Sequence, residues 1–298
     1  MILASAAPPG STIGVVTPAT PPPRRSDVLR GIEWWEANGY RVKLAPNALE
    51  RWRDFAGTPE ARARDLQELF ADPGVHAIQT MRGGYGSAEV VPILDYDAIA
   101  ASPKPFLRFS DITGKWRDRP GGEPRQRRCV EGDKTGEASE RPAEGGADGP
   151  PVRTIAGGRA SGPVVGGCLP DLVHTFLTSW EVETEGAILF FEVAAYGPTF
   201  VDRHLVQLRQ AGKLEGVAGI VVGELPEGEW GEGLGPDWPR ASTLEDVLEQ
   251  RLGDLGVPVF YGLPIGHGET LSTLPLGVRA TLDADALTLT IDEPALTT

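Results

Sequence analysis

The sequence predicts an α/β protein in two parts: an N-terminal, mostly parallel sheet with helices on both faces, and a C-terminal α/β domain. Short apolar segments alternate with amphipathic segments before residue 113 and again after residue 162. This alternation is typical of parallel strands joined by crossover helices, as in Rossmann-like or flavodoxin-like sheets. Residues 278–291 instead alternate with period two around Asp283-Ala-Asp285, which indicates a closing β-hairpin.

The first series contains capped helices between apolar strands. Ser26 and Thr58 are residue types that cap helix N-termini well, and Pro59 suits a first helical turn. We expect helices from Ser26 to Asn38, from Thr58 to Phe70 and over 87–94, and strands at 12–16, 40–44, 75–81 and directly before Ser110.

The second series repeats this pattern. Its apolar stretches are short enough for buried strands, and its longer periodic stretches are typical of helices. We expect helices near 169–178, 200–212 and 244–252, and strands at 187–192, 217–222 and 257–261.

The length of 298 residues exceeds a comfortable single core and predicts two domains. We assign 1–113 to an N-terminal domain and 162–298 to a C-terminal domain, with 114–161 as a disordered or aberrant linker. Between Trp116 and Val152 almost no residue is apolar, so no helix face can be buried there. Two origins stay open: a lineage-specific linker, or a translated shifted reading frame of GC-rich coding sequence.

Charge and composition limit the partners. The formal net charge is -14 and the pI is near 4.8, so nucleic acid and anionic membranes would be repelled. Cys129 and Cys168 form neither a disulfide framework nor a metal-binding spacing, and we expect no metal or organic cofactor. The start lacks the basic and apolar regions of a signal peptide, and no run reaches transmembrane length. We expect a cytoplasmic protein.

Ser110 is the candidate nucleophile. It follows the apolar stretch that starts at Phe106, and a glycine cluster lies at 81–86. An apolar strand that ends in Ser-Asp can hold a serine hydroxyl on a tight turn beside backbone N–H groups. A serine needs a base and a group that orients the base.

The candidate base is His267. His76, His174 and His204 lie in strand or helix patterns and are interpreted as structural. His267 lies between glycines after an apolar strand, where α/β folds place chemistry.

The candidate acid is Glu192, which ends the apolar run 187–191. A buried parallel strand delivers its last side chain to the crevice at its carboxyl end. The order Ser110, Glu192, His267 matches nucleophile, acid and base in one large class of serine hydrolases. We expect the triad to be split between the two domains, with the active site at their interface.

Short motifs spread over nearly the whole chain resemble the LD-carboxypeptidase family of serine peptidases, which includes the microcin-immunity peptidases. These motifs are Arg82-Gly-Gly-Tyr-Gly, Leu94-Asp-Tyr, Pro103-Lys-Pro, Phe109-Ser-Asp-Ile-Thr, Gly166-Gly, Phe191-Glu, Asp202-Arg with Gln207-Leu, Pro264-Ile-Gly-His-Gly and Leu274-Pro-Leu-Gly.

The resemblance implies roles for these residues. Ser110 is then the nucleophile, His267 the general base and acid, and Glu192 the group that orients His267. The backbone N–H groups of Gly83 and Asp111 form the oxyanion hole.

Arg82 is a candidate for binding a substrate carboxylate, with a surface ion pair as the alternative. The glycine cluster is not a phosphate loop, because no Gly-Lys-Ser/Thr follows it.

The chain departs from the family pattern at three places. Arg108 stands where the family has glycine, and we expect crowding there because the turn before the nucleophile leaves little room. Cys168 replaces a residue that is often Asn, and it is a poor candidate nucleophile. Residues 114–151 replace the apolar helix expected to support Ser110, so activity is expected to be impaired if that support is lost.

The resemblance implies a serine carboxypeptidase that acts on a small peptide with a free carboxylate. The expected reaction is hydrolysis of the L,D-amide bond before the terminal D-Ala of murein tetrapeptide, in cell-wall recycling. The alternatives are a microcin-immunity-type amidase acting on a peptidyl or aminoacyl nucleotide, and a non-catalytic peptide-binding relative. Family membership also implies a homodimer.

Overall fold

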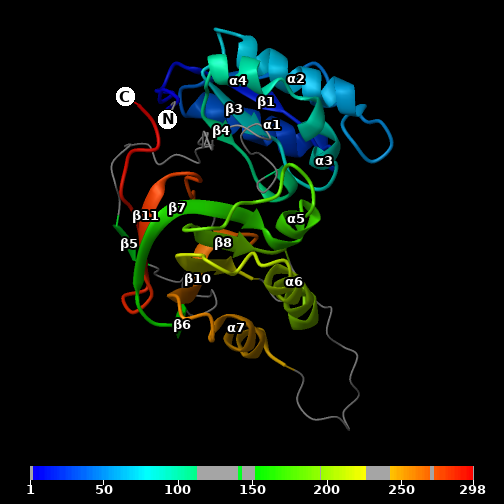
Figure 1. Ribbon diagram of the computed structural model, residues 1–298. Coiled ribbons are helices and arrows are strands. Elements are labelled where there is room, and N and C mark those ends of the chain that lie inside the picture. Colours follow the sequence, from blue (N-terminus) through cyan, green and yellow to red (C-terminus); the bar gives the residue numbers. More distant parts are fainter. Residues whose placement is uncertain are drawn as a thin grey trace. The chain divides into compact units, whose positions relative to one another are not determined.

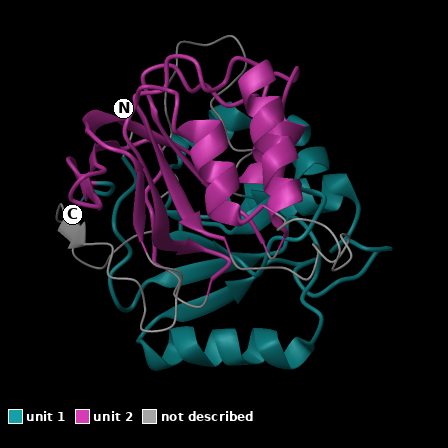
Figure 2. Cartoon of the chain, turned by 90° about the horizontal axis from the view of Figure 1, so that it is seen from below, with its two compact units in different colours: residues 1–136, 295–298 teal, residues 137–294 magenta. Residues whose placement is uncertain are grey.

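The computed structural model describes residues 3–112, 140–142, 152–194, 196–225, 242–268 and 272–297, with only the backbone at 140–142. The chain forms two compact units, coloured in Figure 2. Unit 1 comprises residues 1–136 and 295–298, and unit 2 comprises residues 137–294. The predicted linker 114–161 lies mostly outside the described residues, and the predicted domain boundaries stay predictions.

Unit 1 contains a four-stranded parallel sheet in the order β2-β1-β3-β4. Three of these strands, β1, β3 and β4, are labelled in Figure 1. Its strands are β1 (Thr12–Val16), β2 (Arg41–Leu44), β3 (Ala77–Thr80) and β4 (Phe106–Leu107). Its helices are α1 (Arg25–Ala37), α2 (Pro59–Ala71), α3 (Ser87–Val90) and α4 (Tyr96–Ala101), with 3-10 turns η1 (Val91–Ile93) and η2 (Ser110–Ile112).

Helices cover both faces of this sheet, as predicted. On one face Ile13 and Val15 pack with Trp35 of α1. On the other face Val16 and Ile78 belong to a core built with α2, α3 and α4. Alternate residues along β1 and β3 therefore serve the two cores, as expected for a doubly covered parallel sheet.

Two helix predictions in unit 1 were wrong in detail. Arg24, not Ser26, precedes α1, and its side chain makes no capping hydrogen bond. The helix expected over 87–94 ends at Val90, because Pro92 lies in the next turn and supplies no backbone N–H. The short helix α4 was not predicted; Asp95 caps it by accepting from the backbone N–H groups of its first turn.

Unit 2 contains an eight-stranded sheet in the order β5-β12-β11-β7-β8-β9-β10-β6. The four central strands β7 (Arg159–Cys168), β8 (Ile188–Glu192), β9 (Gly219–Glu224) and β10 (Val259–Gly266) are parallel. The flanking strands β5 (Glu140–Pro142), β6 (Arg153–Ala156), β11 (Arg279–Asp283) and β12 (Thr288–Ile291) are antiparallel to their neighbours.

The two faces of the unit 2 sheet differ. Helices α5 (Leu169–His174), α6 (Pro198–Gln210) and α7 (Leu244–Leu252) cover one face, where Leu189 and Phe191 are buried. Ile188 and Phe190 face a second core that includes residues of β11 and β12. The helix predicted at 244–252 and the closing hairpin are confirmed.

The sequence missed β6 and β7, and misjudged the end of β10. Glycines in β7 hide its alternation but allow close approach: a Cβ on Gly166, which has φ +138°, would lie 1.7 Å from the Phe190 carbonyl oxygen. Pro264–Gly266, expected as a loop, continues β10 through two register shifts. Helix α5 ends at His174 rather than near Thr178.

Candidate active site

Ser110 lies on a strained turn, separated from the end of β4 by two residues. Its φ is +56°, in the left-handed region that non-glycine residues rarely adopt. It opens the 3-10 turn η2, whose residues Asp111 and Ile112 are buried. Backbone strain of this kind costs roughly 1–3 kcal/mol and is concentrated at functional turns. The turn is the feature expected of a nucleophilic serine at the end of a strand.

Gly83 packs against this turn through its backbone. A Cβ at Gly83 would lie 2.4 Å from the Ser110 Cβ, 2.8 Å from the Phe109 carbonyl oxygen and 3.0 Å from the Asp111 nitrogen. Only glycine fits there without displacing the turn. The two segments that carry the predicted oxyanion donors, the backbone N–H groups of Gly83 and Asp111, are therefore neighbours within unit 1.

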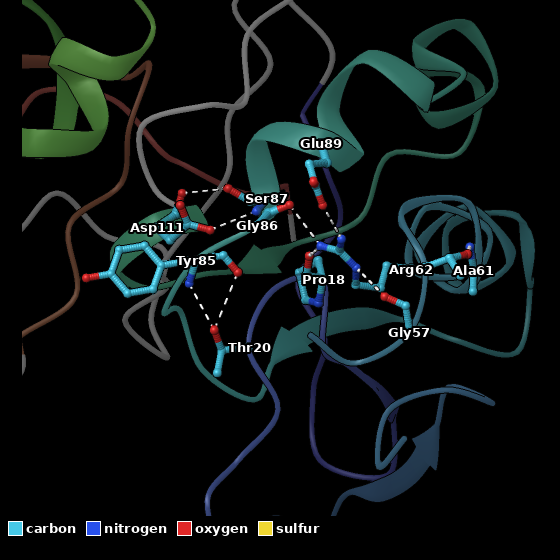
Figure 3. Close-up of polar contacts among 11 residues, drawn as sticks. Pro18, Thr20, Gly57, Ala61, Arg62, Tyr85, Gly86, Ser87, Glu89 and Asp111 are labelled. Carbon is cyan, nitrogen blue, oxygen red and sulfur yellow. Dashed lines mark hydrogen bonds and ion pairs between the residues drawn. The ribbon is translucent and has the colours of Figure 1, made fainter. Parts of the chain in front are cut away.

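The Asp111 side chain ties the turn to the glycine cluster. Its Oδ2 accepts a hydrogen bond from the Ser87 N–H at 2.8 Å, and the Ser87 hydroxyl donates to the Asp111 carbonyl oxygen at 2.8 Å (Figure 3). Ser87 begins α3, so a carboxylate from a distant segment caps this short helix. Sequence reasoning considered only the backbone of Asp111, because the partner lies 24 residues away.

Arg62 holds the same loop from the other side. It is fully buried on α2 and donates to the carbonyl oxygens of Pro18, Gly57 and Gly86 and to the Glu89 carboxylate, at 2.7–3.0 Å (Figure 3). Sequence reasoning missed it. Its spacing of four residues from Leu66, on the buried face of α2, was the available signal.

The two arginines near the candidate nucleophile differ in environment. Arg82 is exposed, and no hydrogen bond joins it to another described residue. Arg108 is only 6 % exposed, and its Nη1 is buried without a hydrogen-bond partner within the described ranges. The positive φ near this turn belongs to Ser110 and not to Arg108. The crowding expected at position 108 stays a prediction.

In unit 2, Glu192 and His267 form a hydrogen-bonded pair. Glu192 ends β8 and is 4 % exposed, and its Oε2 lies 2.5 Å from Nδ1 of His267, which directly follows β10. Strand β9 lies between β8 and β10 in the sheet. Gly223 of β9 makes the contact possible, since a Cβ there would lie 3.0 Å from the Glu192 Cβ. A carboxylate bound at Nδ1 orients the ring and leaves Nε2 for proton transfer.

A second buried carboxylate lies beside His267. Glu224 ends β9 and is 4 % exposed, and a Cβ on Gly268 would lie 1.4 Å from its Oε2. Carboxylates at the ends of adjacent strands thus flank the histidine segment. Sequence reasoning passed over Glu224, because it lies two residues beyond the end of the expected strand 217–222.

Cys168 ends β7 in register with Glu192. Burial raises the pKa of its thiol far above the usual range, and the nearby carboxylates of Glu192 and Asp171 add to the shift. A protonated, buried thiol is a weak nucleophile. In the described parts of the chain, no group of three or more His, Cys, Asp or Glu side chains is placed to hold a metal ion.

Comparison with known proteins identifies the family. Residues 13–115 match the model of the LD-carboxypeptidase N-terminal domain, and residues 161–282 match that of its C-terminal domain. The chain belongs to the LD-carboxypeptidase family. The α/β fold predicted from the sequence agrees with this membership. None of the helices in the described ranges is long and apolar enough to cross a membrane.

Curated relatives match over almost the entire chain. A putative carboxypeptidase of Synechocystis is 37% identical, with 94% of each chain covered. The murein tetrapeptide carboxypeptidase of Pseudomonas aeruginosa is 28% identical, over 88% of this chain and 90% of that protein. The microcin C7 self-immunity protein of Escherichia coli is 25% identical, over 97% and 95%.

Solved structures share the fold. The muramoyltetrapeptide carboxypeptidase of Oxalobacter formigenes has a TM-score of 0.75 and 25% identity, covering 97% of this chain and 100% of that one. A complex of MccF with glutamyl sulfamoyl guanosine has a TM-score of 0.78 and 22% identity, with full coverage of both chains.

Proposed function

We propose that this member of the LD-carboxypeptidase family is a serine carboxypeptidase that hydrolyses the L,D-amide bond before the terminal D-Ala of murein tetrapeptide. The observation that carries the proposal is the 2.5 Å contact between the Glu192 carboxylate and His267 Nδ1. The strained turn at Ser110 supplies the matching nucleophile. The names of the carboxypeptidase relatives support the substrate class.

In the proposed mechanism, the Ser110 hydroxyl attacks the scissile carbonyl while His267 Nε2 takes its proton. Glu192 stabilises the imidazolium that forms. The backbone N–H groups of Gly83 and Asp111 donate to the oxyanion of the tetrahedral intermediate. His267 then protonates the leaving amine, D-Ala departs, and water hydrolyses the acyl-enzyme by the reverse sequence of proton transfers.

The mechanism requires that the two units bring Ser110 to His267. We further propose that the protein works in the cytoplasm as a homodimer on peptides released from the cell wall. The net charge of -14 supports a small peptide rather than nucleic acid as its partner.

The test is release of D-Ala from purified murein tetrapeptide, measured by mass spectrometry. A tetrapeptide that ends in L-Ala is the matched control, and we expect cleavage of the D form only. Cleavage of an aminoacyl sulfamoyl nucleotide but not of tetrapeptide would favour the microcin-immunity-type amidase instead, an alternative supported by the similarity to the E. coli self-immunity protein. Tetrapeptide binding without turnover of either compound would favour a non-catalytic peptide-binding protein.

A further inference from the structure

Two buried polar atoms without partners lie at the ends of neighbouring strands. They are the Thr80 hydroxyl oxygen, at the end of β3, and Arg108 Nη1, just after β4. In the β3–β4 register, Ile78 pairs with Phe106 and Gln79 with Leu107. Extending this register by one position, just past the end of β4, puts Thr80 opposite Arg108. Ile78 and Phe106 share one core cluster, so alternation places Thr80 and Arg108 on that same side of the sheet.

The charge of Arg108 is not compensated by the acidic groups of the nearby loop. The Asp111 carboxylate accepts from the Ser87 N–H, and the Glu89 carboxylate pairs with Arg62. Arg108 makes no hydrogen bond or ion pair with any residue in the described ranges. A buried guanidinium without a counter-charge is strongly disfavoured, and this favours a site that an anion completes.

The place and chemistry of the pair point to a carboxylate. Arg108 is two residues before Ser110 on the same backbone. In a carboxypeptidase substrate, the terminal carboxylate is separated from the scissile carbonyl by one nitrogen and one carbon. The group that binds this carboxylate must therefore lie close to the nucleophile, within the reach of a side chain from a neighbouring residue. The guanidinium fork matches a carboxylate, and a hydroxyl can donate to the same group.

We propose that Arg108 and Thr80 bind the free C-terminal carboxylate of the peptide substrate and restrict the enzyme to the last residue of a peptide. This assignment rests on the proposed carboxypeptidase function. It gives the specificity role to the buried Arg108 and not to the exposed Arg82. Water competes for the guanidinium of an exposed arginine, whereas a buried one discriminates by the cost of staying unpaired.

The first experiment measures binding and needs no turnover. A tetrapeptide ending in free D-Ala and the same peptide ending in D-Ala carboxamide are titrated into the Ser110→Ala protein by calorimetry. We expect the free acid to bind at least tenfold tighter. Adding Arg108→Met should abolish this preference, whereas adding Arg82→Met should preserve it. Equal binding of acid and amide, absence of binding, or a preference that survives Arg108→Met would each overturn the proposal.

The second experiment separates ligand binding from a structural role. If Arg108 and Thr80 are unpaired until a ligand binds, Arg108→Met and Thr80→Val leave the melting temperature of the peptide-free protein unchanged or raise it. Both substitutions then weaken binding of the free-acid peptide. If Arg108 and Thr80 were instead paired inside the protein, both substitutions would lower the melting temperature of the peptide-free protein. A lower melting temperature for both variants would overturn the proposal.

The two proposals can fail separately. If the native enzyme does not hydrolyse tetrapeptide but the Ser110→Ala protein still distinguishes acid from amide through Arg108, the hydrolase proposal fails and the subsite stands. If the native enzyme cleaves the acid and the amide with equal kcat/KM, peptide hydrolysis stands and the subsite falls.

Discussion

The two units hold their candidate catalytic side chains in different ways. In unit 1, Ser110 lies on a turn with a left-handed backbone, and polar side chains brace that turn: Asp111 binds Ser87, and Arg62 binds the Gly86 carbonyl. In unit 2, Glu192 ends a strand that is buried along its entire length, and His267 directly follows another.

The difference indicates where each half is vulnerable. A strained turn persists only because several surrounding contacts hold it in place, whereas a strand end is held rigid by the apolar core. We therefore expect substitutions of the residues that brace the Ser110 turn to change stability and activity together. Conservative substitutions of Glu192 and His267 should change activity alone.

The largest effect is expected for Ser110→Ala, which removes the proposed nucleophile. Turnover should fall by about 10⁴- to 10⁶-fold with unchanged folding. Ser110→Gly should lose as much activity but gain up to about 1 kcal/mol in the free energy of unfolding, because glycine adopts a φ of +56° without strain. Turnover assays and urea unfolding measure both. Native turnover in Ser110→Ala would exclude the serine mechanism.

Glu192→Gln should lower kcat by about 10⁴-fold, because the amide cannot stabilise the imidazolium of His267. The free energy of unfolding should change by less than about 1 kcal/mol, since the amide oxygen still accepts from Nδ1. His267→Ala should be as inactive, and the double variant no worse than either, because the pair acts as one unit. If the losses in kcat of the two single variants added up in the double variant, Glu192 and His267 would not act as one unit.

Arg62→Met tests the bracing of unit 1. It removes hydrogen bonds to three backbone carbonyl groups, two of them buried, and we expect a loss of about 2–4 kcal/mol in the free energy of unfolding with reduced activity. Arg64→Met is the matched control, because Arg64 lies on the same helix but is exposed. Urea denaturation compares the two. Equal stability of both variants would mean that Arg62 does not brace the loop.

Gly83→Ala tests the close approach of the glycine cluster to Ser110. The added methyl should displace the turn and lower kcat by about 10²-fold, as a shift of about 1 Å at a catalytic group does. Gly31→Ala on α1 is the control: no atom lies near its new methyl, and helix propensity should add about 0.5–1 kcal/mol of stability. Unchanged kcat in Gly83→Ala would show that the turn tolerates movement.

The smallest effect is expected for Cys168→Ser, which should alter kcat by less than about threefold, because a buried thiol with a raised pKa performs no step. In the native protein, iodoacetamide should leave Cys168 unlabelled at neutral pH, and unfolding should expose it. Peptide mapping locates the label. Rapid labelling of folded protein at Cys168 would show that its environment is more open than its burial indicates.

Sequence patterns predicted the elements whose signals are local. Thr58 caps α2 by accepting from the Ala61 N–H, and the helix at 244–252 and the closing hairpin were found because capping residues and alternation lie within a few positions. Strand β7 was not predicted. Its glycines allow close contact with the neighbouring strand β8, and they interrupt the apolar–polar alternation by which a strand is recognised in a sequence.

The candidate site shows the same limit. Ser110, Glu192 and His267 each follow or end an apolar run that is visible in the sequence, although the end of β10 before His267 was misjudged. Their catalytic roles stay predictions. Arg62 was missed, because its importance comes from partners distant in the sequence. Glu224 was missed, because it lies two residues beyond the expected strand 217–222. Whether residues 114–151 are a linker or a shifted reading frame falls outside the described part of the chain.

The return of the chain to unit 1 near its last residues has a consequence for biosynthesis. The Ala6 N–H donates to the Thr297 carbonyl oxygen, and the Thr297 hydroxyl reaches the Ala4 carbonyl oxygen, a separation of 293 residues. Contacts of such long range close late, because the entropy of a large loop must be overcome first. During translation, the N-terminal sheet emerges first, but segment 4–6 cannot form these hydrogen bonds until residue 297 has left the ribosome. Unit 1, which carries Ser110, is therefore the first to be made and the last to be finished.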